Sequence, residues 1–559
     1  MKNSFLKNLL LNNKKFVAIT LVLVTLTSIT ATITPVLVQL LSNTAEGMSV
    51  SAFGIVIGAM TLSFVMQFAL LVYRENYAAR FNTQHLSSLL RRMHGMTYDS
   101  YIKREPTYLI NRMFGAVDNL YLFLVSGLGE LIRALLVLSV VLVLAFSVHV
   151  LVFLALLLLI PVNFFGFRFI NRRLKSKMES MQEQSATANK DLVSTLSNAD
   201  AVKQLPQYEV LERLLVPGIG KMYRTLAGTN RFAQGTSSIV DFINRLFQNM
   251  LYLTITYAIA RQWLPIGSIV IVGLILPLFF DALGGLTRIN LNLKTLETSL
   301  DFVASELDAQ READGAIEVG RIGEITLENP MFELDGKTMS YRINARLCAG
   351  QVVHLQGPSG SGKSSLLKLL LGFRNGRGIR INDIPIDKIA KRSLRSRIAY
   401  ASQQMTILSK SLEENIGWGR ALTNGEKEKL EKSAVLAPIL RSRSWDAPLT
   451  ENGANLSGGE KQRVAVARML LQGADVYLLD ECTSSIDQAS ADDIFRTLLE
   501  AAGGKLVIYT SHSRDAAKYA THTICIETGN FNEYILDDRG SGQAASGHDP
   551  DDPQLPEIR

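Results

Sequence analysis

The sequence contains few cysteines: three occur among 559 residues, namely Cys348, Cys482 and Cys525. Thiols that are so few and so widely spaced argue against a disulfide-stabilised scaffold and against a cysteine-ligated metal cluster. We therefore expect free thiols in a reducing compartment. All three lie in the second half of the chain, so the two halves already differ in composition.

Charged residues are scarce over long stretches of the first 290 positions. The chain is 47% hydrophobic and its mean hydropathy is +0.16, which is high for a soluble protein. A helix crosses the ~30 Å hydrocarbon core of a bilayer with about 20 apolar residues. No signal peptide is expected, because the first apolar run is too long and no small-residue cleavage site follows it. Six spans are predicted, at about 16–41, 52–73, 131–148, 149–167, 238–260 and 266–287.

Lysine and arginine are distributed unevenly between the loops. The first 15 residues contain four lysines, and 74–130 and 168–237 contain many more basic residues, whereas 42–51 and 146–150 contain none. Because cytoplasmic loops carry the excess of Lys and Arg, we expect the termini and the long loops in the cytoplasm and the chain in the cytoplasmic (inner) membrane. This asymmetry accounts for much of the net charge of +7, so no nucleic-acid partner is expected.

The two long loops lack the Gly, Pro and Ser clusters of flexible linkers. Apolar residues recur at helical spacing over His85–Met96 and Leu192–Leu205, which predicts helices that extend the spans into the cytoplasm. We expect the chain to reverse near Pro106 and Pro206. The segment Thr295–Ala316 continues helically and then becomes polar, which is typical of a linker.

A glycine-rich turn marks the start of a second domain, whose short alternating strands begin near Ile322. The stretch "GQVVHLQGPSGSGKSSLLKLLLG" reads as strand, turn and helix and contains G-x-x-x-x-G-K-S. Backbone amides of such a loop converge on phosphate oxygens at a helix N-terminus. We expect Lys363 to reach the β- and γ-phosphates of ATP and Ser364 to ligate Mg²⁺. The predicted nucleotide-binding residues of this loop are Gly357, Pro358, Ser359, Gly360, Ser361, Gly362, Lys363, Ser364 and Ser365.

Two carboxylates end the apolar run "ADVYLLDE" (474–481). Taken alone, two acids after such a run are usually solvated residues at a helix start. Behind a strand and downstream of a phosphate-binding lysine, they predict chemistry instead. We expect Asp480 to hold the metal through water and Glu481 to polarise the attacking water as a general base.

Three motifs, "LSGGEKQR", "YLLDECTSSID" and "YTSHS", follow one another in the order shown by the ATPase domain of ATP-binding cassette (ABC) transporters, which this region resembles. The resemblance implies that Gln403 contacts Mg²⁺ and faces the membrane domain, that Asp487 lies in the loop crossing the dimer interface, and that His512 touches the γ-phosphate. Glu451 stands where exporters of this family have an acidic loop that senses the membrane domain. The expected catalytic residues are Glu481, His512 and Gln403, and the expected metal ligands are Ser364, Gln403 and Asp480.

The stretch "ANLSGGEKQR" (454–463) carries neither a metal ligand nor an obvious nucleophile. In the family's arrangement, Ser457, Gly458 and Gly459 offer a hydroxyl and amide groups at a helix start to a γ-phosphate on the other subunit. The resemblance thus implies an ATP site completed in trans. Because this one chain has Glu481 and an intact Ser-Gly-Gly, a homodimer with two competent sites is the simpler expectation.

Six spans with long cytoplasmic extensions ahead of an ATPase resemble the exporter branch of the family. The expected fold is an all-α transmembrane domain followed by an α/β P-loop ATPase domain, and the reversals near Pro106 and Pro206 would be coupling helices. The expected boundaries are a transmembrane domain at 1–310, a linker at 311–322, the ATPase domain at 323–538 and a tail at 539–559, disordered by composition.

One position departs from the exporter pattern. These exporters usually have an aromatic residue ahead of the phosphate loop, where it stacks on adenine, and the alignment places Leu334 there. Phe332 is expected in the core, and Tyr341 is a candidate substitute for the missing aromatic. Weaker or less base-selective adenine binding is therefore a hypothesis, which ATP and GTP affinities of Leu334→Tyr would test.

Polar residues in or near the spans have two interpretations. Intramembrane charges are by default a functional hypothesis. The simpler interpretation is that threonine hydroxyls bond to their own helix and that Asp241 and Arg245 pair one turn apart. The residues concerned are Thr27, Thr30, Thr34, Gln67, Glu130, Arg133, Asp241, Arg245 and Asp281.

The expected activity is ATP-driven export of an amphipathic or peptide substrate. A lipid, a siderophore or a drug are alternative cargoes, and an ATP-gated channel or regulator and an importer-type cassette ATPase are alternative functions. Because about 15 residues precede the first span, we expect no protease domain for leader cleavage.

Overall fold

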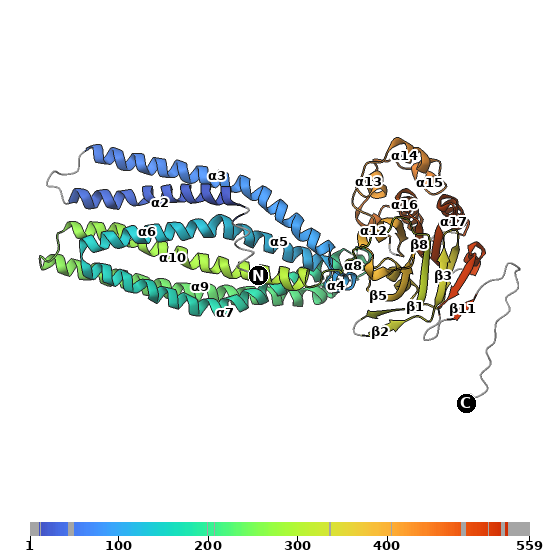
Figure 1. Cartoon of the computed structure of the whole chain (residues 1–559). Helices are drawn as coiled ribbons and strands as arrows, with labels where there is room; N and C mark the ends of the chain where they lie inside the picture. The colour runs from blue at the N-terminus through green and yellow to red at the C-terminus, as the bar shows by residue number, and fades with distance from the viewer. Residues whose placement is uncertain are drawn as a thin grey trace, which may run out of the picture. The chain divides into compact units, whose positions relative to one another are not determined.

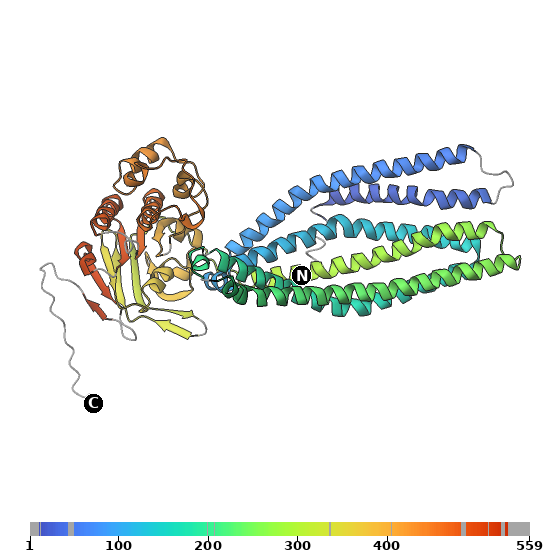
Figure 2. The same ribbon diagram turned by 180° about the vertical axis from the view of Figure 1, so that it is seen from behind.

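The computed structural model describes residues 11, 13–42, 50–197, 199–205, 207–334, 337–403, 405–481, 488–511, 514–526 and 532–534. The chain forms two compact units, Met1–Arg311 and Glu312–Arg559. The first is helical and the second combines strands and helices (Figures 1 and 2). The expected fold class, an all-α region followed by an α/β domain, is confirmed.

Long helices dominate the first unit. Helix α9 has 53 residues, which at 1.5 Å per residue makes it about 80 Å long and much longer than a bilayer is thick. The described elements are α2 (Lys14–Ser42), α3 (Val50–His94), α4 (Tyr98–Arg104), α5 (Pro106–Leu122), a π-helical turn η1 (Phe123–Gly127), α6 (Leu128–Val148), α7 (Val150–Leu196), α8 (Ala199–Gln204), α9 (Tyr208–Ala260), α10 (Gly267–Phe302) and a π-helical turn η2 (Val303–Asp308).

Each predicted span falls on one of the helices α2, α3, α6, α7, α9 and α10. By length and composition, three stretches among the described residues can cross a membrane: Ile57–His94, Pro106–Val148 and Gly267–Leu286. A shorter apolar helix covers Val150–Asn163. The tight turn expected between the third and fourth spans is confirmed, because His149 alone separates α6 from α7.

The extensions that the sequence predicts beyond the spans are helical, with one interruption. Helix α3 continues to His94, but the helix expected over Leu192–Leu205 is divided, with α7 ending at Leu196 and α8 beginning at Ala199. The reversal near Pro106 is confirmed: Pro106 opens α5, and Glu105 before it has φ of 58°. Pro206 lies outside the described residues.

The helices of the first unit pack in pairs along their length, with α6 against α10 and α7 against α9 (Figures 1 and 2). Their shared interior is apolar and includes Val141, Leu156, Ile275 and Phe279. Large apolar side chains are also exposed on the outside, such as Phe64 at 68%. An apolar exterior of this kind is suited to lipid.

The second unit contains two sheets. The antiparallel sheet has the order β2-β1-β5-β6, and β3 pairs with the N-terminal part of β1. The larger sheet has the order β11-β10-β4-β9-β8-β7 and is parallel except at β11. The strands are β1 (Glu324–Leu334), β2 (Lys337–Ser340), β3 (Asn344–Cys348), β4 (Val352–Gln356), β5 (Gly376–Ile381), β6 (Ile384–Pro385), β7 (Ile398–Ala401), β8 (Val476–Asp480), β9 (Leu506–Thr510), β10 (His522–Cys525) and β11 (Asn532–Tyr534).

Helices cover the parallel sheet, and α13, α14 and α15 gather at one end of the unit (Figure 1). Every residue of β8 and β9 is buried, as in parallel sheets covered on both faces. Because β4, β9 and β8 are parallel neighbours, their carboxyl ends meet at one edge of the sheet. α/β sheets bind ligands at this edge. The α-helices are α11 (Lys363–Leu370), α12 (Lys391–Arg397), α13 (Leu412–Gly417), α14 (Asn424–Glu431), α15 (Ala437–Leu440), α16 (Gly458–Gln472) and α17 (Gln488–Ala502).

Candidate nucleotide site

The phosphate loop connects β4 to α11. Gly360 and Gly362 have φ of 83° and 97°, in the left-handed region that favours glycine. A Cβ on Gly357 would lie 2.2 Å from the carbonyl oxygen of Ile526. The Ser361 hydroxyl is buried and has no hydrogen-bond partner among the described residues, so it is a donor available to a phosphate oxygen.

Lys363 begins α11 directly after this loop. Its side chain is buried, and Nζ donates hydrogen bonds to the carbonyl oxygens of Gly357 at 2.8 Å and Pro358 at 2.9 Å. The ammonium group is thereby held against the loop, beside the amides at the helix start. A buried cation in a glycine-rich loop at a helix N-terminus suits a triphosphate.

Asp480 ends β8 and is only 3% exposed. Its Oδ1 accepts hydrogen bonds from the Ser364 hydroxyl at 2.9 Å and from the Thr510 hydroxyl at 3.0 Å, and its Oδ2 accepts one from the Tyr400 hydroxyl at 3.3 Å. The structure thus brings Ser364 and Asp480 together, as the motifs predicted. The motifs gave no sign of Tyr400, and Thr510 stands within "YTSHS" without an assigned role.

Two hard oxygen donors, the Ser364 hydroxyl and the Asp480 carboxylate, fit a magnesium ion that keeps its waters and binds phosphate. The described residues contain no cluster of three or more His, Cys, Asp or Glu side chains suited to a metal. The donor set is therefore compatible with Mg²⁺ that arrives with a nucleotide.

Glu481 follows Asp480 with φ of 52°, an uncommon conformation for a residue other than glycine. Its amide donates to the Thr510 hydroxyl at 3.0 Å, and its Oε2 accepts a hydrogen bond of 2.7 Å from Nε2 of Gln403. The side chains of Gln403 and Glu481 are therefore hydrogen-bonded to each other at the carboxyl end of β8. Two predicted catalytic residues from distant parts of the sequence meet here.

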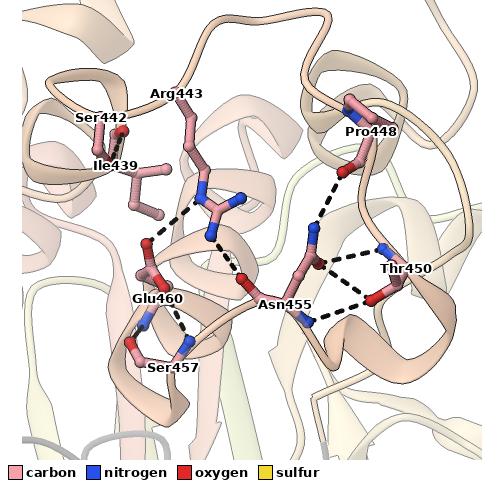
Figure 3. Close-up of polar contacts among 8 residues, drawn as sticks. All are labelled: Ile439, Ser442, Arg443, Pro448, Thr450, Asn455, Ser457 and Glu460. Carbon is pink, nitrogen blue, oxygen red and sulfur yellow. Dashed lines mark hydrogen bonds and ion pairs between the residues drawn. The ribbon is translucent and has the colours of Figure 1, made fainter.

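Ser457 caps the N-terminus of α16 in a capping box. Its hydroxyl accepts from the Glu460 amide at 3.2 Å, and Glu460 Oε2 accepts from the Ser457 amide at 2.7 Å (Figure 3). Helix geometry leaves the amides of Gly458 and Gly459 without an acceptor inside the helix. Two amides and the serine hydroxyl remain available to an anion. Within the described part of the unit, this segment and the phosphate loop have separate polar networks.

Several predicted residues lie outside what the structure describes. Asp487 and His512 fall in undescribed segments, and only the backbone of Glu451 is described, in a short 3₁₀ turn. Their assigned roles stay predictions.

Tyr341 does not replace the missing adenine platform. It is only 3% exposed, and its hydroxyl donates to the carbonyl oxygen of Gly362 at 2.9 Å. Burial raises its pKa to about 12, so it remains a neutral hydrogen-bond donor. The expectation that it could stack on adenine is wrong, because its ring packs beside Phe332 beneath the loop. The core position expected for Phe332 is confirmed.

Polar side chains in the first unit mostly follow the simpler interpretation. The hydroxyls of Thr27 and Thr30 donate to carbonyl oxygens of their own helix, each at 3.0 Å. Asp241 and Arg245, both within the described part of α9, form no ion pair with each other, contrary to expectation. Instead Arg133 of α6 pairs with Asp281 of α10 at 3.3 Å.

A cavity of about 330 Å³ lies among the helices of this unit. Its wall combines apolar and polar groups. A Cβ on Gly129 would come within 2.6 Å of the Arg74 guanidinium, so glycine makes room for that cation. The lining residues are Val24, Thr27, Gln67, Leu70, Leu71, Arg74, Gly129, Glu130 and Arg133.

A phosphate loop, an acidic strand end and a Ser-Gly-Gly helix start on an α/β unit, in one chain with membrane-length helices, define a membrane-bound transport ATPase. The family models agree. The ABC transporter transmembrane region matches residues 16–283, and the ABC transporter model matches residues 341–484. The chain belongs to the ABC transporters, with a membrane region and an ATPase region fused in one polypeptide.

Curated relatives include a probable ABC transporter ATP-binding/permease protein of Haemophilus influenzae, 33% identical over 42% of this chain and 43% of the relative. An ATP-dependent lipid A-core flippase of Bordetella avium is 26% identical over 78% of this chain and 76% of the relative. The matched part thus spans less than half of the first relative and about three quarters of the second. A bacterial Atm1-family ABC exporter, solved with ATP bound, has the same fold, with a TM-score of 0.78, 22% identity and coverage of 94% of this chain and 95% of that chain.

Proposed function

We propose that two copies of this chain form an exporter that uses ATP to move an amphipathic substrate across the inner membrane. The cluster of Ser364, Asp480, Glu481 and Gln403 carries the proposal, because its oxygen atoms could bind a metal ion and accept a proton next to the phosphate loop that contains Lys363. The membrane-length helices of the same chain supply the path.

Each chemical role follows from these contacts. The loop amides and Lys363 would bind the phosphates, and Ser364 and Asp480 would hold Mg²⁺, which would neutralise charge on the phosphates. Glu481 accepts a proton from the attacking water. Its amide is fixed by Thr510 and its carboxylate by Gln403, so two hydrogen bonds orient the base.

A second copy of the chain would complete each site. The Ser457 hydroxyl and the amides of Gly458 and Gly459 would bind the γ-phosphate held by the partner copy. Closure of the two ATPase units around ATP would turn a membrane cavity from the cytoplasm to the outside, and hydrolysis would reset it. The basic loops favour an ATPase unit in the cytoplasm.

The cavity lined by polar residues such as Gln67 and Arg74 and by apolar residues such as Leu70 and Leu71 favours a cargo with both polar and apolar parts. Relatives that are named lipid A-core flippases make a lipid the second candidate beside a peptide. Stimulation of ATP hydrolysis by a panel of lipids and amphipathic peptides would separate these two classes.

Reconstitution in liposomes tests the pump. With ATP, the wild type is expected to accumulate the stimulating substrate against its gradient, and Glu481→Gln, which keeps the shape of the side chain but removes the base, is expected to lower hydrolysis by about 10²- to 10³-fold and stop accumulation. The exposed Glu500→Gln on α17 is the control. Accumulation by Glu481→Gln at the wild-type rate would show a driving force other than ATP hydrolysis, and loss of accumulation in Glu500→Gln would show an effect unrelated to the base.

A further inference from the structure

Glu460 places a negative charge at the helix start that the proposed function assigns to phosphate. Its Oε2 accepts a hydrogen bond from the Ser457 amide at 2.7 Å. The carboxylate is therefore bound to the residue that directly precedes Gly458 and Gly459. A carboxylate at the third helical position stabilises the cap. The same charge repels a γ-phosphate that approaches those amides, unless a cation compensates it.

Arg443 supplies that cation. Its Nε lies 3.5 Å from Oε1 of Glu460, and each of the two side chains is only 25% exposed. One oxygen of Glu460 therefore serves the capping box and the other faces the guanidinium (Figure 3). Because the pair is mostly withdrawn from solvent, its charges are screened less than those of a surface pair.

Arg443 also holds the backbone that leads to Ser457. Its Nη2 donates a hydrogen bond to the carbonyl oxygen of Asn455, two residues before the N-cap residue Ser457. The Asn455 side chain in turn accepts from the amide and the hydroxyl of Thr450, both at 3.1 Å, and donates to the carbonyl oxygen of Pro448 at 3.1 Å. These bonds close the loop 448–455, and Arg443 joins this loop to Glu460 (Figure 3).

We propose that Arg443 is a positioning residue for the half-site that binds ATP in trans. Its positive charge compensates the negative charge of Glu460, and its hydrogen bond to Asn455 fixes the backbone before Ser457. The serine hydroxyl and the two glycine amides can then attract the γ-phosphate without repulsion from Glu460. This inference rests on the proposed function, because it assumes that the helix start of α16 binds the nucleotide of a partner copy.

The test compares ATP hydrolysis by full-length variants in lipid nanodiscs. Arg443→Met removes the charge and the donors but keeps a long side chain, and is expected to raise KM for ATP about tenfold while kcat changes less than threefold. Adding Glu460→Gln should return KM to within about threefold of the wild type, because glutamine also completes a capping box and leaves no unpaired charge. Arg443→Lys should lie close to the wild type, and the exposed Arg441→Met on the same segment is the control.

The outcomes separate charge from folding. Glu460→Gln alone should leave KM unchanged or lower it, and this variant keeps Arg443 in case Arg443→Met fails to fold. The inference is overturned if Arg443→Met behaves like Arg441→Met, if Glu460→Gln alone raises KM, or if the double variant is as defective as Arg443→Met. Absence of ATP hydrolysis in the wild type would instead contradict the proposed function itself.

Discussion

Thr510 links the two carboxylates at the end of β8. Its hydroxyl donates to Asp480 and accepts from the Glu481 amide, each at 3.0 Å, and the side chain is buried. One hydroxyl therefore holds both the carboxylate of the proposed metal ligand, Asp480, and the backbone amide of the proposed base, Glu481, in position. Thr510 thus has a role in the site that its place within "YTSHS" did not reveal.

Thr510→Val is expected to slow ATP hydrolysis with little effect on packing volume. Valine fills the same space but leaves the Glu481 amide without its acceptor, and loss of one buried hydrogen bond costs about 1–2 kcal/mol, or about tenfold in kcat if it is felt in the transition state. Thr510→Ser keeps the hydroxyl and should retain most of the activity. A valine variant with wild-type kcat would show that Thr510 only packs.

At the residue scale, contiguous motifs predicted Lys363, Ser364, Asp480 and Glu481 because one loop or one strand end carries their chemistry. Thr510 and Tyr400 could not be predicted in the same way. Their positions depend on the pairing of β8 with β9 and of β8 with β7, which is a tertiary property. Tyr341 was wrongly considered for adenine because the sequence did not reveal that its hydroxyl bonds to the phosphate loop.

At the element scale, the six apolar runs predicted helices well, because a membrane-length run leaves few alternatives. The break between α7 and α8 was missed, since apolar spacing continues across it. Short elements such as α14 depend on caps. Thr423 and Glu426 form a capping box there, and Arg420 pairs with Glu426 in a bidentate contact of 2.9 Å.

The α14 cap predicts a pH-dependent contribution to stability. Hydrogen bonds from Arg420 and from Thr423 lower the pKa of Glu426 from 4.5 to about 2. A carboxyl whose pKa is lower in the folded state stabilises the fold above its unfolded pKa, and this contribution is lost as the pH falls through the folded pKa. The wild type should therefore exceed Glu426→Gln in free energy of unfolding at pH 7, and the difference should shrink from about pH 4.5 to about pH 2.

Urea unfolding of the detergent-solubilised chain, followed by tryptophan fluorescence, measures this difference, since Trp418 and Trp445 lie in the same region of the unit. Glu428→Gln on the same helix is the control, because its pair with Lys432 is exposed and contributes little. A difference between wild type and Glu426→Gln that stays constant from pH 7 to pH 3 would contradict the assignment.

At the scale of the whole molecule, the chain carries one membrane region and one ATPase region. Among the described residues, its phosphate loop and its Ser-Gly-Gly helix start have separate polar networks; the loop has the unpartnered Ser361 hydroxyl, and the helix start leaves the amides of Gly458 and Gly459 to an external acceptor. These observations support the central claim that ATP is bound between two copies, with the phosphate loop of one and the Ser457 segment of the other.

Complementation between two inactive variants tests this claim most directly. Lys363→Ala removes the phosphate-binding cation, and Gly458→Asp places a carboxylate where the γ-phosphate would bind, so each variant alone should lack ATP hydrolysis. In a mixed dimer, one site combines both defects and the other has neither, so a randomly reassembled mixture should recover about one quarter of the wild-type activity if the sites act independently. A mixture in which two affinity tags confirm mixed dimers, yet which stays as inactive as each variant alone, would contradict the account.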